Sequence, residues 1–185
     1  MLREQGYNRC AAVCYACEWA YSRNEKFYDF ENIGGDCANF VSQCLLAGCC
    51  VMNFSKTNGW YYLDTNTRAP AWTSIRYMYD FLTTNTGPGP YAKEVPLSQL
   101  EIGDIVQLAN EEGVYYHTAL VTCASHGKIL VTAHSSNAYM RPLSTYSFSA
   151  VRGLHILGCR QRTKADRALP CSEAETEANP DPDVG

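Results

Sequence analysis

The chain contains no apolar run long enough to cross a bilayer, and its N-terminus lacks the charged-then-apolar pattern of a signal peptide. We therefore expect no membrane span, and a protein that is either cytoplasmic or secreted after loss of a leader absent from this sequence. No internal repeat is visible, and 185 residues are enough for one domain with a real core.

Basic residues are not in excess, since 15 Lys and Arg stand against 19 Asp and Glu. Five acidic residues and no basic ones follow Cys171, and the rest of the chain is close to neutral. This balance gives no electrostatic basis for a nucleic-acid partner. Because the chain turns polar and then acidic, with prolines, we expect a domain over residues 1–160 and an acidic, disordered tail over residues 161–185.

Histidine is scarce and cysteine is abundant, with four and ten residues respectively. One cysteine stands apart, because Cys37 follows Gly34-Gly35-Asp36 directly and begins an apolar helical pattern that runs to Gly48. The two glycines permit a tight turn, and Asp36 suits the N-cap position. At the start of a helix the dipole favours a thiolate, so we expect the pKa of Cys37 to be lowered and its sulfur to act as a nucleophile.

Most of the other cysteines are expected to be reduced, structural thiols, because they fall inside helical and strand patterns. Cys10, Cys14 and Cys17 have the spacing of an iron–sulfur cluster loop, which requires exposed, flexible backbone. Here they fall within an amphipathic helix expected over residues 7–23, so we interpret them as core residues of that helix.

The order of the elements indicates an α+β domain, with helices first and an antiparallel sheet after them. A second helix is expected over residues 73–84, followed by a Gly-Pro break at residues 86–90. Strands are expected at 105–109, 115–124, 128–133 and 151–157, with a loop at 135–142. The loop over residues 51–71 is rich in aromatic residues, and Trp60 is a candidate contact for a ligand.

Two histidines are expected to meet at one edge of this sheet. His117 starts one strand and His134 ends the next, and in an antiparallel hairpin these positions are neighbours. His117 would accept the thiol proton of Cys37, and His134 would orient its ring, with Asn137 as a weaker candidate for that role. Three ligands with an open position could also hold zinc, but a cysteine at a helix start does not favour a metal site. We expect no metal and no cofactor.

Several motifs along the chain resemble the putative amidase domain family, which is related to the NlpC-type and CHAP-type cell-wall hydrolases of papain-like fold. The matching segments are Tyr7-Asn8-Arg9, Ala11-Ala12-Val13, Trp19-Ala20, Gly34-Gly35-Asp36-Cys37, Asn39-Phe40-Val41-Ser42-Gln43, Leu46-Ala47-Gly48, Trp60-Tyr61-Tyr62, Ala71-Trp72, Gly103-Asp104-Ile105-Val106-Gln107, His117, His134-Ser135 and Arg141-Pro142-Leu143.

The resemblance implies a papain-like fold in which N-terminal helices pack on a C-terminal antiparallel sheet. It also implies Cys37 as nucleophile, His117 as base and a polar third residue at His134. Asp36 and Trp60 are our candidates for substrate binding. Ala38 departs from the usual hydroxyl residue, and Cys49 and Cys50 stand where glycine is usual.

The sequence therefore predicts a cysteine amidase or peptidase that cleaves an amide bond through a thioester, with peptides of bacterial peptidoglycan as one substrate class. The oxyanion would be held by the Cys37 backbone N–H and one side chain that the sequence does not identify. Two alternatives remain open at this point. The fold could serve as a catalytically silent binding module for cell-wall material or peptides, or the enzyme could transfer its acyl group to an acceptor other than water.

Overall fold

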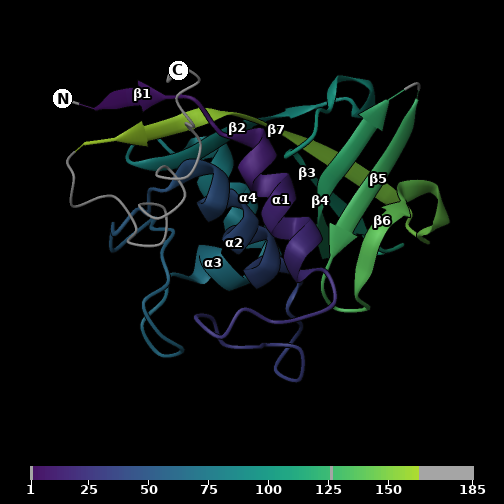
Figure 1. Ribbon diagram of the computed structural model, residues 1–185, viewed down its shortest axis with the longest axis horizontal. Helices are drawn as coiled ribbons and strands as arrows, with labels where there is room; N and C mark the ends of the chain where they lie inside the picture. The colour runs from purple at the N-terminus through teal and green to yellow at the C-terminus, as the bar shows by residue number, and fades with distance from the viewer. Residues whose placement is uncertain (1, 126, 163–185) are drawn as a thin grey trace, which may run out of the picture.

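The computed structural model describes residues 2–125 and 127–162, so His126 and the predicted tail from residue 163 lie outside it. The described residues form an α+β unit in which the helices gather on one face of a mostly antiparallel sheet (Figure 1). No helix among these residues is long and apolar enough to span a bilayer. The helices are α1 (Arg9–Trp19), α2 (Cys37–Cys49), α3 (Pro70–Thr73) and α4 (Ile75–Thr84).

The sheet runs in the order β1-β7-β3-β4-β5-β6, and β2 pairs with β7 off this path. Its strands are β1 (Arg3–Gln5), β2 (Gly89–Val95), β3 (Ile105–Ala109), β4 (Tyr115–Ser125), β5 (Lys128–Ala133), β6 (Ala138–Pro142) and β7 (Ala150–Gln161). Short 3-10 helices η1 (Leu97–Gln99) and η2 (Leu143–Thr145) connect strands.

The predicted α+β class and the predicted β3, β4 and β5 are confirmed within one residue. Three strands, β1, β2 and β6, were missed, the last two for a common reason. The loop expected over 135–142 contains β6, and the break expected at 86–90 opens β2. Both elements contain a proline, which lowers strand propensity but is tolerated at an edge, where no backbone N–H has to be donated to a neighbour.

The helix predictions were too long at their ends. The helix expected over 7–23 spans Arg9–Trp19, and it starts where the Asn8 side chain accepts a hydrogen bond from the backbone N–H of Ala11 at 3.0 Å. The helix expected over 73–84 begins at Ile75, after the separate short α3.

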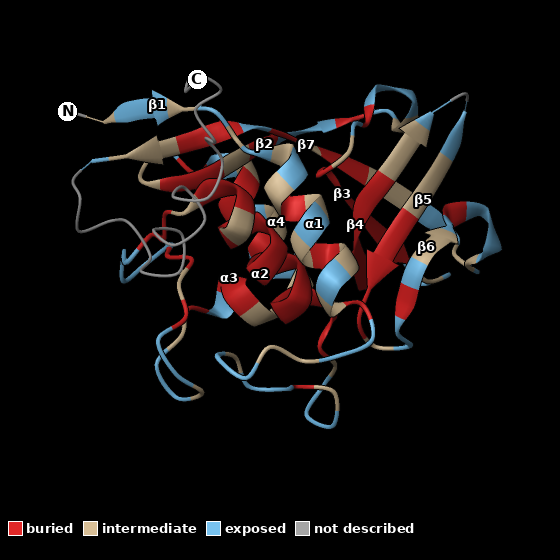
Figure 2. Cartoon of the chain, viewed as in Figure 1, coloured by how far each residue is buried: buried red, intermediate tan, exposed pale blue. Residues whose placement is uncertain are grey.

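Helix α2 is the centre of the fold, because nearly all of its residues are buried (Figure 2). Its apolar side chains Phe40, Val41 and Leu45 belong to the larger core cluster, which lies between the helices and the sheet. A helix that is buried all round must also satisfy its polar side chains internally. Three of these, Asn39, Ser42 and Gln43, do so through partners on other segments.

The polar side chains of α2 fasten it to the aromatic residues around it. Ser42 accepts a hydrogen bond from the indole N–H of Trp60 at 3.0 Å and donates to the backbone carbonyl of Trp72 at 2.9 Å. Asn39 accepts from the indole N–H of Trp72 at 2.8 Å, and Gln43 accepts from the Tyr15 hydroxyl at 2.7 Å. The motif that surrounds Cys37 therefore positions its helix through buried hydrogen bonds.

The sheet has two packed faces, and the alternation of side chains decides which residues meet. Ile105 and Leu120 point into the cluster shared with the helices, whereas Leu108 and Ala119 belong to a second cluster on the opposite face. Leu108 pairs directly with His117, so the pleat places the His117 side chain on that second face.

Replacing Ser42 with alanine tests the anchoring of α2. The variant leaves the buried indole N–H of Trp60 without a partner, so we expect a loss of about 1–3 kcal/mol in the free energy of unfolding. Urea denaturation followed by tryptophan fluorescence measures this loss. The control variant Ser98→Ala alters an exposed serine and should change stability by less than about 0.5 kcal/mol. Equal effects of the two substitutions would contradict the anchoring role.

Candidate active site

Cys37 is the first residue of α2 and follows a turn that contains two glycines, as the sequence predicts. Gly34 and Gly35 have φ angles of +93° and +100°, which side chains with a Cβ rarely adopt. A Cβ on Gly35 would also approach the Ser135 hydroxyl to 3.2 Å. The turn thus brings the start of the helix against the segment that follows β5.

Asp36 precedes the nucleophile candidate and is fully buried. It was expected to cap α2, but its side chain makes no capping bond. One carboxylate oxygen instead accepts from the Phe30 backbone N–H at 3.0 Å and from the Asn39 side-chain amide at 2.8 Å. The other oxygen lies 2.6 Å from Nδ1 of His134. Asp36 therefore ties the incoming loop and the helix to the end of β5.

His134 is held on both ring nitrogens. Nδ1 donates to Asp36, and Nε2 lies 2.8 Å from the backbone carbonyl of Trp19 at the end of α1. Both ring nitrogens of His134 therefore have a buried hydrogen-bond partner. Its face stacks on Phe40, with ring centroids 3.9 Å apart. Within the described residues, His134 contacts Asp36 and makes no hydrogen bond to His117.

Further polar residues lie around the pair of Asp36 and His134. Ser135 accepts a hydrogen bond from the Asp36 backbone N–H at 2.7 Å, and its own N–H donates to Glu31 at 3.1 Å. Arg23 lies 3.7 Å from Asp36 and donates to the Asn137 side chain at 3.1 Å. Asn137, the weaker candidate for orienting His117, is thus engaged with Arg23.

The Cys37 sulfur lies against β4, where the backbone N–H groups of Thr118, Ala38 and Cys37 itself face it. Burial raises the pKa of the Cys37 thiol, and these three amides lower it by less than burial raises it. The expectation of a lowered pKa is therefore wrong for this state of the protein. The helix start does favour the thiolate, but exclusion of water from the side chain outweighs it.

His117 is buried on the face of the sheet opposite to α2, beside Tyr146, whose ring centroid lies 5.6 Å from that of the histidine. Burial, with a smaller contribution from the Arg141 cation, lowers the pKa of His117 to about 4, so the ring is neutral near pH 7. Its Nε2 has no hydrogen-bond partner among the residues that the structure describes. No hydrogen bond in this part of the chain joins His117 to Cys37.

The structure thus brings the predicted residues together in two groups. Cys37 lies next to the peptide unit that links His117 to Thr118, while the His117 ring lies on the opposite face of the sheet. His134 pairs with Asp36, a partner that the sequence analysis missed because the pairing depends on how far the loop after β5 returns toward α2. Trp60, a candidate ligand contact, has no exposed surface and packs in the core.

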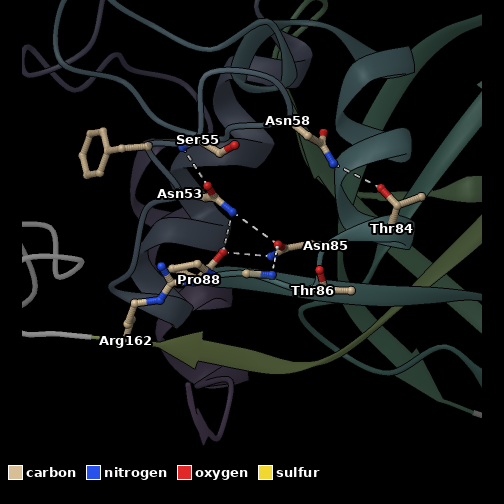
Figure 3. Close-up of a pocket in the computed structure, with 10 residues that line it drawn as sticks. Asn53, Ser55, Asn58, Thr84, Asn85, Thr86, Pro88 and Arg162 are labelled. Atoms are coloured by element: carbon tan, nitrogen blue, oxygen red, sulfur yellow. Dashed lines mark hydrogen bonds between the residues drawn. The ribbon is translucent and has the colours of Figure 1, made fainter. Parts of the chain in front are cut away.

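Two hollows lie elsewhere on the described surface. One, of about 440 Å³, is bounded by the loop at residues 53–58 and the turn at 84–88 (Figure 3). Asn53 and Asn85 line it, but both side chains bind each other and the Pro88 carbonyl. The other, of about 460 Å³, lies between β2 and β7. Neither is lined by Cys37 or His117.

The remaining cysteines do not form a cluster site. Cys10 and Cys14 are exposed on α1 and Cys17 is half-buried, so the expectation that they are core residues is wrong for the first two. No group of three or more potential metal ligands is found among the described residues. The free thiols among these residues are Cys10, Cys14, Cys17, Cys37, Cys44, Cys49, Cys123 and Cys159. Cys50 is disulfide-bonded, so the expectation of reduced cysteines is wrong for this one.

The site thus combines a buried helix that begins with Cys37, an antiparallel sheet that carries His117 on β4, and His134 directly after β5. The chain belongs to the family described as "Putative amidase domain", whose sequence model matches residues 6–157. The match thus covers all four helices and most of the sheet.

Two curated relatives come from Bacillus subtilis (strain 168), and both are named as uncharacterized proteins. YhbB is 28% identical over 139 residues, which is 73% of this chain and 43% of that protein. YjcM is 26% identical over 141 residues, which is 72% of this chain and 32% of that protein. The chain therefore spans less than half of the length of either relative. No solved structure matches it.

The buried pair of Asp36 and His134 leads to a prediction about stability. Asp36→Asn replaces one of the two acceptor oxygens with an amide NH2 group, so one buried partner loses its hydrogen bond, and we expect a loss of about 1–3 kcal/mol in the free energy of unfolding. Asp29→Asn is the matched control, because Asp29 also faces Arg23 but is 45% exposed. It should cost less than about 1 kcal/mol. If urea titrations give similar losses for both variants, the pair is not the anchor of the site.

The pKa of His117 leads to a prediction about pH. The value falls from 6.5 in a free chain to about 4 in the folded protein. Between these values the unfolded chain binds the proton more tightly, so stability should fall as the pH drops from 6.5 toward 4, by up to about 3 kcal/mol from this group. Above pH 6.5 the group contributes no pH dependence. Denaturation at several pH values measures the slope, and His117→Gln should flatten it; an unchanged slope in that variant would refute the assignment.

Proposed function

We propose that this protein is a cysteine-dependent hydrolase that cleaves an amide or peptide bond, with Cys37 as nucleophile. The observation that carries the proposal is the position of the sulfur at the start of a rigid, buried helix, faced by three backbone N–H groups. Membership of an amidase family supports it. Backbone N–H groups arranged in this way stabilise a thiolate, and they also suit the oxyanion that forms when a carbonyl is attacked.

The proposed reaction follows from these groups. His117 takes the thiol proton, the Cys37 thiolate attacks the amide carbonyl, and the tetrahedral intermediate collapses to a thioester as His117 protonates the leaving amine. Water then attacks the thioester and releases the acid, which restores the thiol. An amine or alcohol in place of that water would give acyl transfer by the same groups.

In the described geometry the proton transfer requires a movement of His117. The pairing of β3 with β4 shifts between Leu108 and Ala109, which leaves Tyr116 as an extra residue directly before His117. Such bulges re-aim side chains and occur next to active sites. We infer that the start of β4 turns the imidazole toward Cys37 when substrate binds, while His134 acts as a positioning residue that fixes α2 through Asp36.

The fold and substrate class are proposed on the resemblance to the NlpC-type and CHAP-type hydrolases. An α+β unit with helices on one face of an antiparallel sheet is compatible with a papain-like domain. We propose peptide amides, including those of peptidoglycan stem peptides, as the substrates to test first. One observation favours the alternative of a silent binding module, namely that burial raises the pKa of the Cys37 thiol and that Nε2 of His117 makes no hydrogen bond to it.

The decisive experiment measures hydrolysis of a panel of peptide amides by the wild-type chain and by variants. We expect Cys37→Ala to abolish turnover and His117→Ala to reduce kcat/KM by at least about 100-fold, because a positioned base contributes that much. Since burial raises the pKa of the Cys37 thiol, the rate should increase from neutral toward alkaline pH.

Cys10→Ala is the matched control, because it removes an exposed thiol on α1 and should leave the rate unchanged. Mass spectrometry of trapped reactions should locate the acyl group on Cys37. Turnover that survives Cys37→Ala would refute Cys37 as the nucleophile. A second outcome would favour the binding module: no turnover is seen, and iodoacetamide modifies Cys37 equally fast in the wild-type chain and in His117→Ala.

A further inference from the structure

The neighbouring rings of His117 and Tyr146 each carry a buried polar atom that lacks a hydrogen bond within the described residues. The described residues contain three buried side-chain atoms that lack a hydrogen bond, and two of them are His117 Nε2 and the Tyr146 hydroxyl. The two rings stack at 5.6 Å with an angle of 24° between their planes. Each such atom costs about 1–3 kcal/mol unless a ligand or water satisfies it, so their proximity indicates a place where something binds.

Arg141 supplies a positive charge to the same place. It comes from β6, and its guanidinium carbon lies 3.9 Å from the centre of the Tyr146 ring. Its Nε and Nη2 donate to the side chain and backbone oxygen of Thr145, both at 2.9 Å. Arg141 has no ion pair with a carboxylate anywhere in residues 2–125 and 127–162. Burial lowers the pKa of His117 and raises that of Tyr146, and the nearby Arg141 guanidinium acts to lower both, so this place carries a positive charge beside the two rings.

We propose that Arg141 and the Tyr146 hydroxyl form a carboxylate-binding subsite beside His117, and that the amide substrate carries an acidic group there. A single guanidinium with a neutral hydroxyl donor matches the single charge of a carboxylate, whereas a phosphate dianion would bring a second charge that nothing at this place neutralises. The inference rests on the proposed function only in that it calls the bound molecule a substrate. The binding itself does not depend on catalysis.

The subsite gives the two unpartnered atoms separate roles. The Tyr146 hydroxyl donates to the carboxylate, and Nε2 of His117 stays open for the proton of Cys37. A carboxylate next to Arg141 offsets the field that disfavours a charged imidazole, so His117 becomes a better proton acceptor once an acidic substrate is bound. Amides without the acidic group would leave His117 a weak base.

The test measures binding in Cys37→Ala protein, so that no turnover interferes. The probes are N-acetylglycine, which has a carboxylate, and N-acetylglycinamide, its neutral counterpart, and titration calorimetry is combined with NMR of the His117 ring. We expect N-acetylglycine to bind at least about tenfold more tightly than the amide, because a hydrogen bond to a charged group is lost. The His117 resonance should shift only with the acid.

Two substitutions locate the site. Tyr146→Phe should weaken N-acetylglycine binding by about tenfold or more while the urea midpoint stays the same or rises, because the substitution removes a buried hydroxyl that has no partner. Arg141→Gln should abolish the preference for the acid. Tyr139→Phe is the matched control, since Tyr139 lies on β6 with Arg141 but is 45% exposed, and it should alter neither quantity.

Three kinds of outcome overturn the proposed subsite. Equal binding of the two probes, or binding of the acid that neither substitution changes, removes the subsite. Inorganic phosphate that binds as tightly as N-acetylglycine shows a general anion site. A lower midpoint for Tyr146→Phe without any ligand effect shows that an ordered water satisfies the hydroxyl. Selective binding in a protein that hydrolyses nothing would retain the subsite and refute the proposed enzyme.

Discussion

The buried pair of Asp36 and His134 holds together four segments around Cys37. Through one carboxylate and one imidazole it connects the loop before α2, the start of α2, the end of β5 and the last turn of α1. Buried polar groups destabilise a fold unless they are hydrogen-bonded, and here both oxygens of Asp36 and both ring nitrogens of His134 have partners. The exact place of the Cys37 sulfur depends on that pair.

The residues around Cys37 combine two duties that are easy to confuse in a sequence. Asn39, Ser42 and Gln43 have the appearance of active-site residues, yet their side chains bind two tryptophans and a tyrosine inside the core. A helix with no exposed face can carry polar side chains only where partners meet them. The motif therefore specifies how α2 is seated, and through that seating where the thiol is presented.

The two faces of the sheet explain why the predicted set of Cys37, His117 and His134 is divided. Adjacent positions on a strand point to opposite faces, so the peptide unit of Thr118 meets the sulfur while the ring of His117 lies with Tyr146. Water is excluded from both sites. The thiol keeps its proton and the imidazole stays neutral for the same physical reason, which is the cost of a charge in a buried position.

The sequence by itself determined the α+β class, three strands of the sheet, the glycine turn and the helix that starts at Cys37, because each of these follows from local periodicity and backbone freedom. It also placed His117 and His134 at one end of a hairpin. Tertiary structure decided the rest. The pleat and the bulge at Tyr116 set the direction of His117, the return of the loop after β5 paired His134 with Asp36, and burial reversed the expected shift in the pKa of Cys37. None of these is readable from local sequence, since each depends on which distant side chains exclude water or supply a partner.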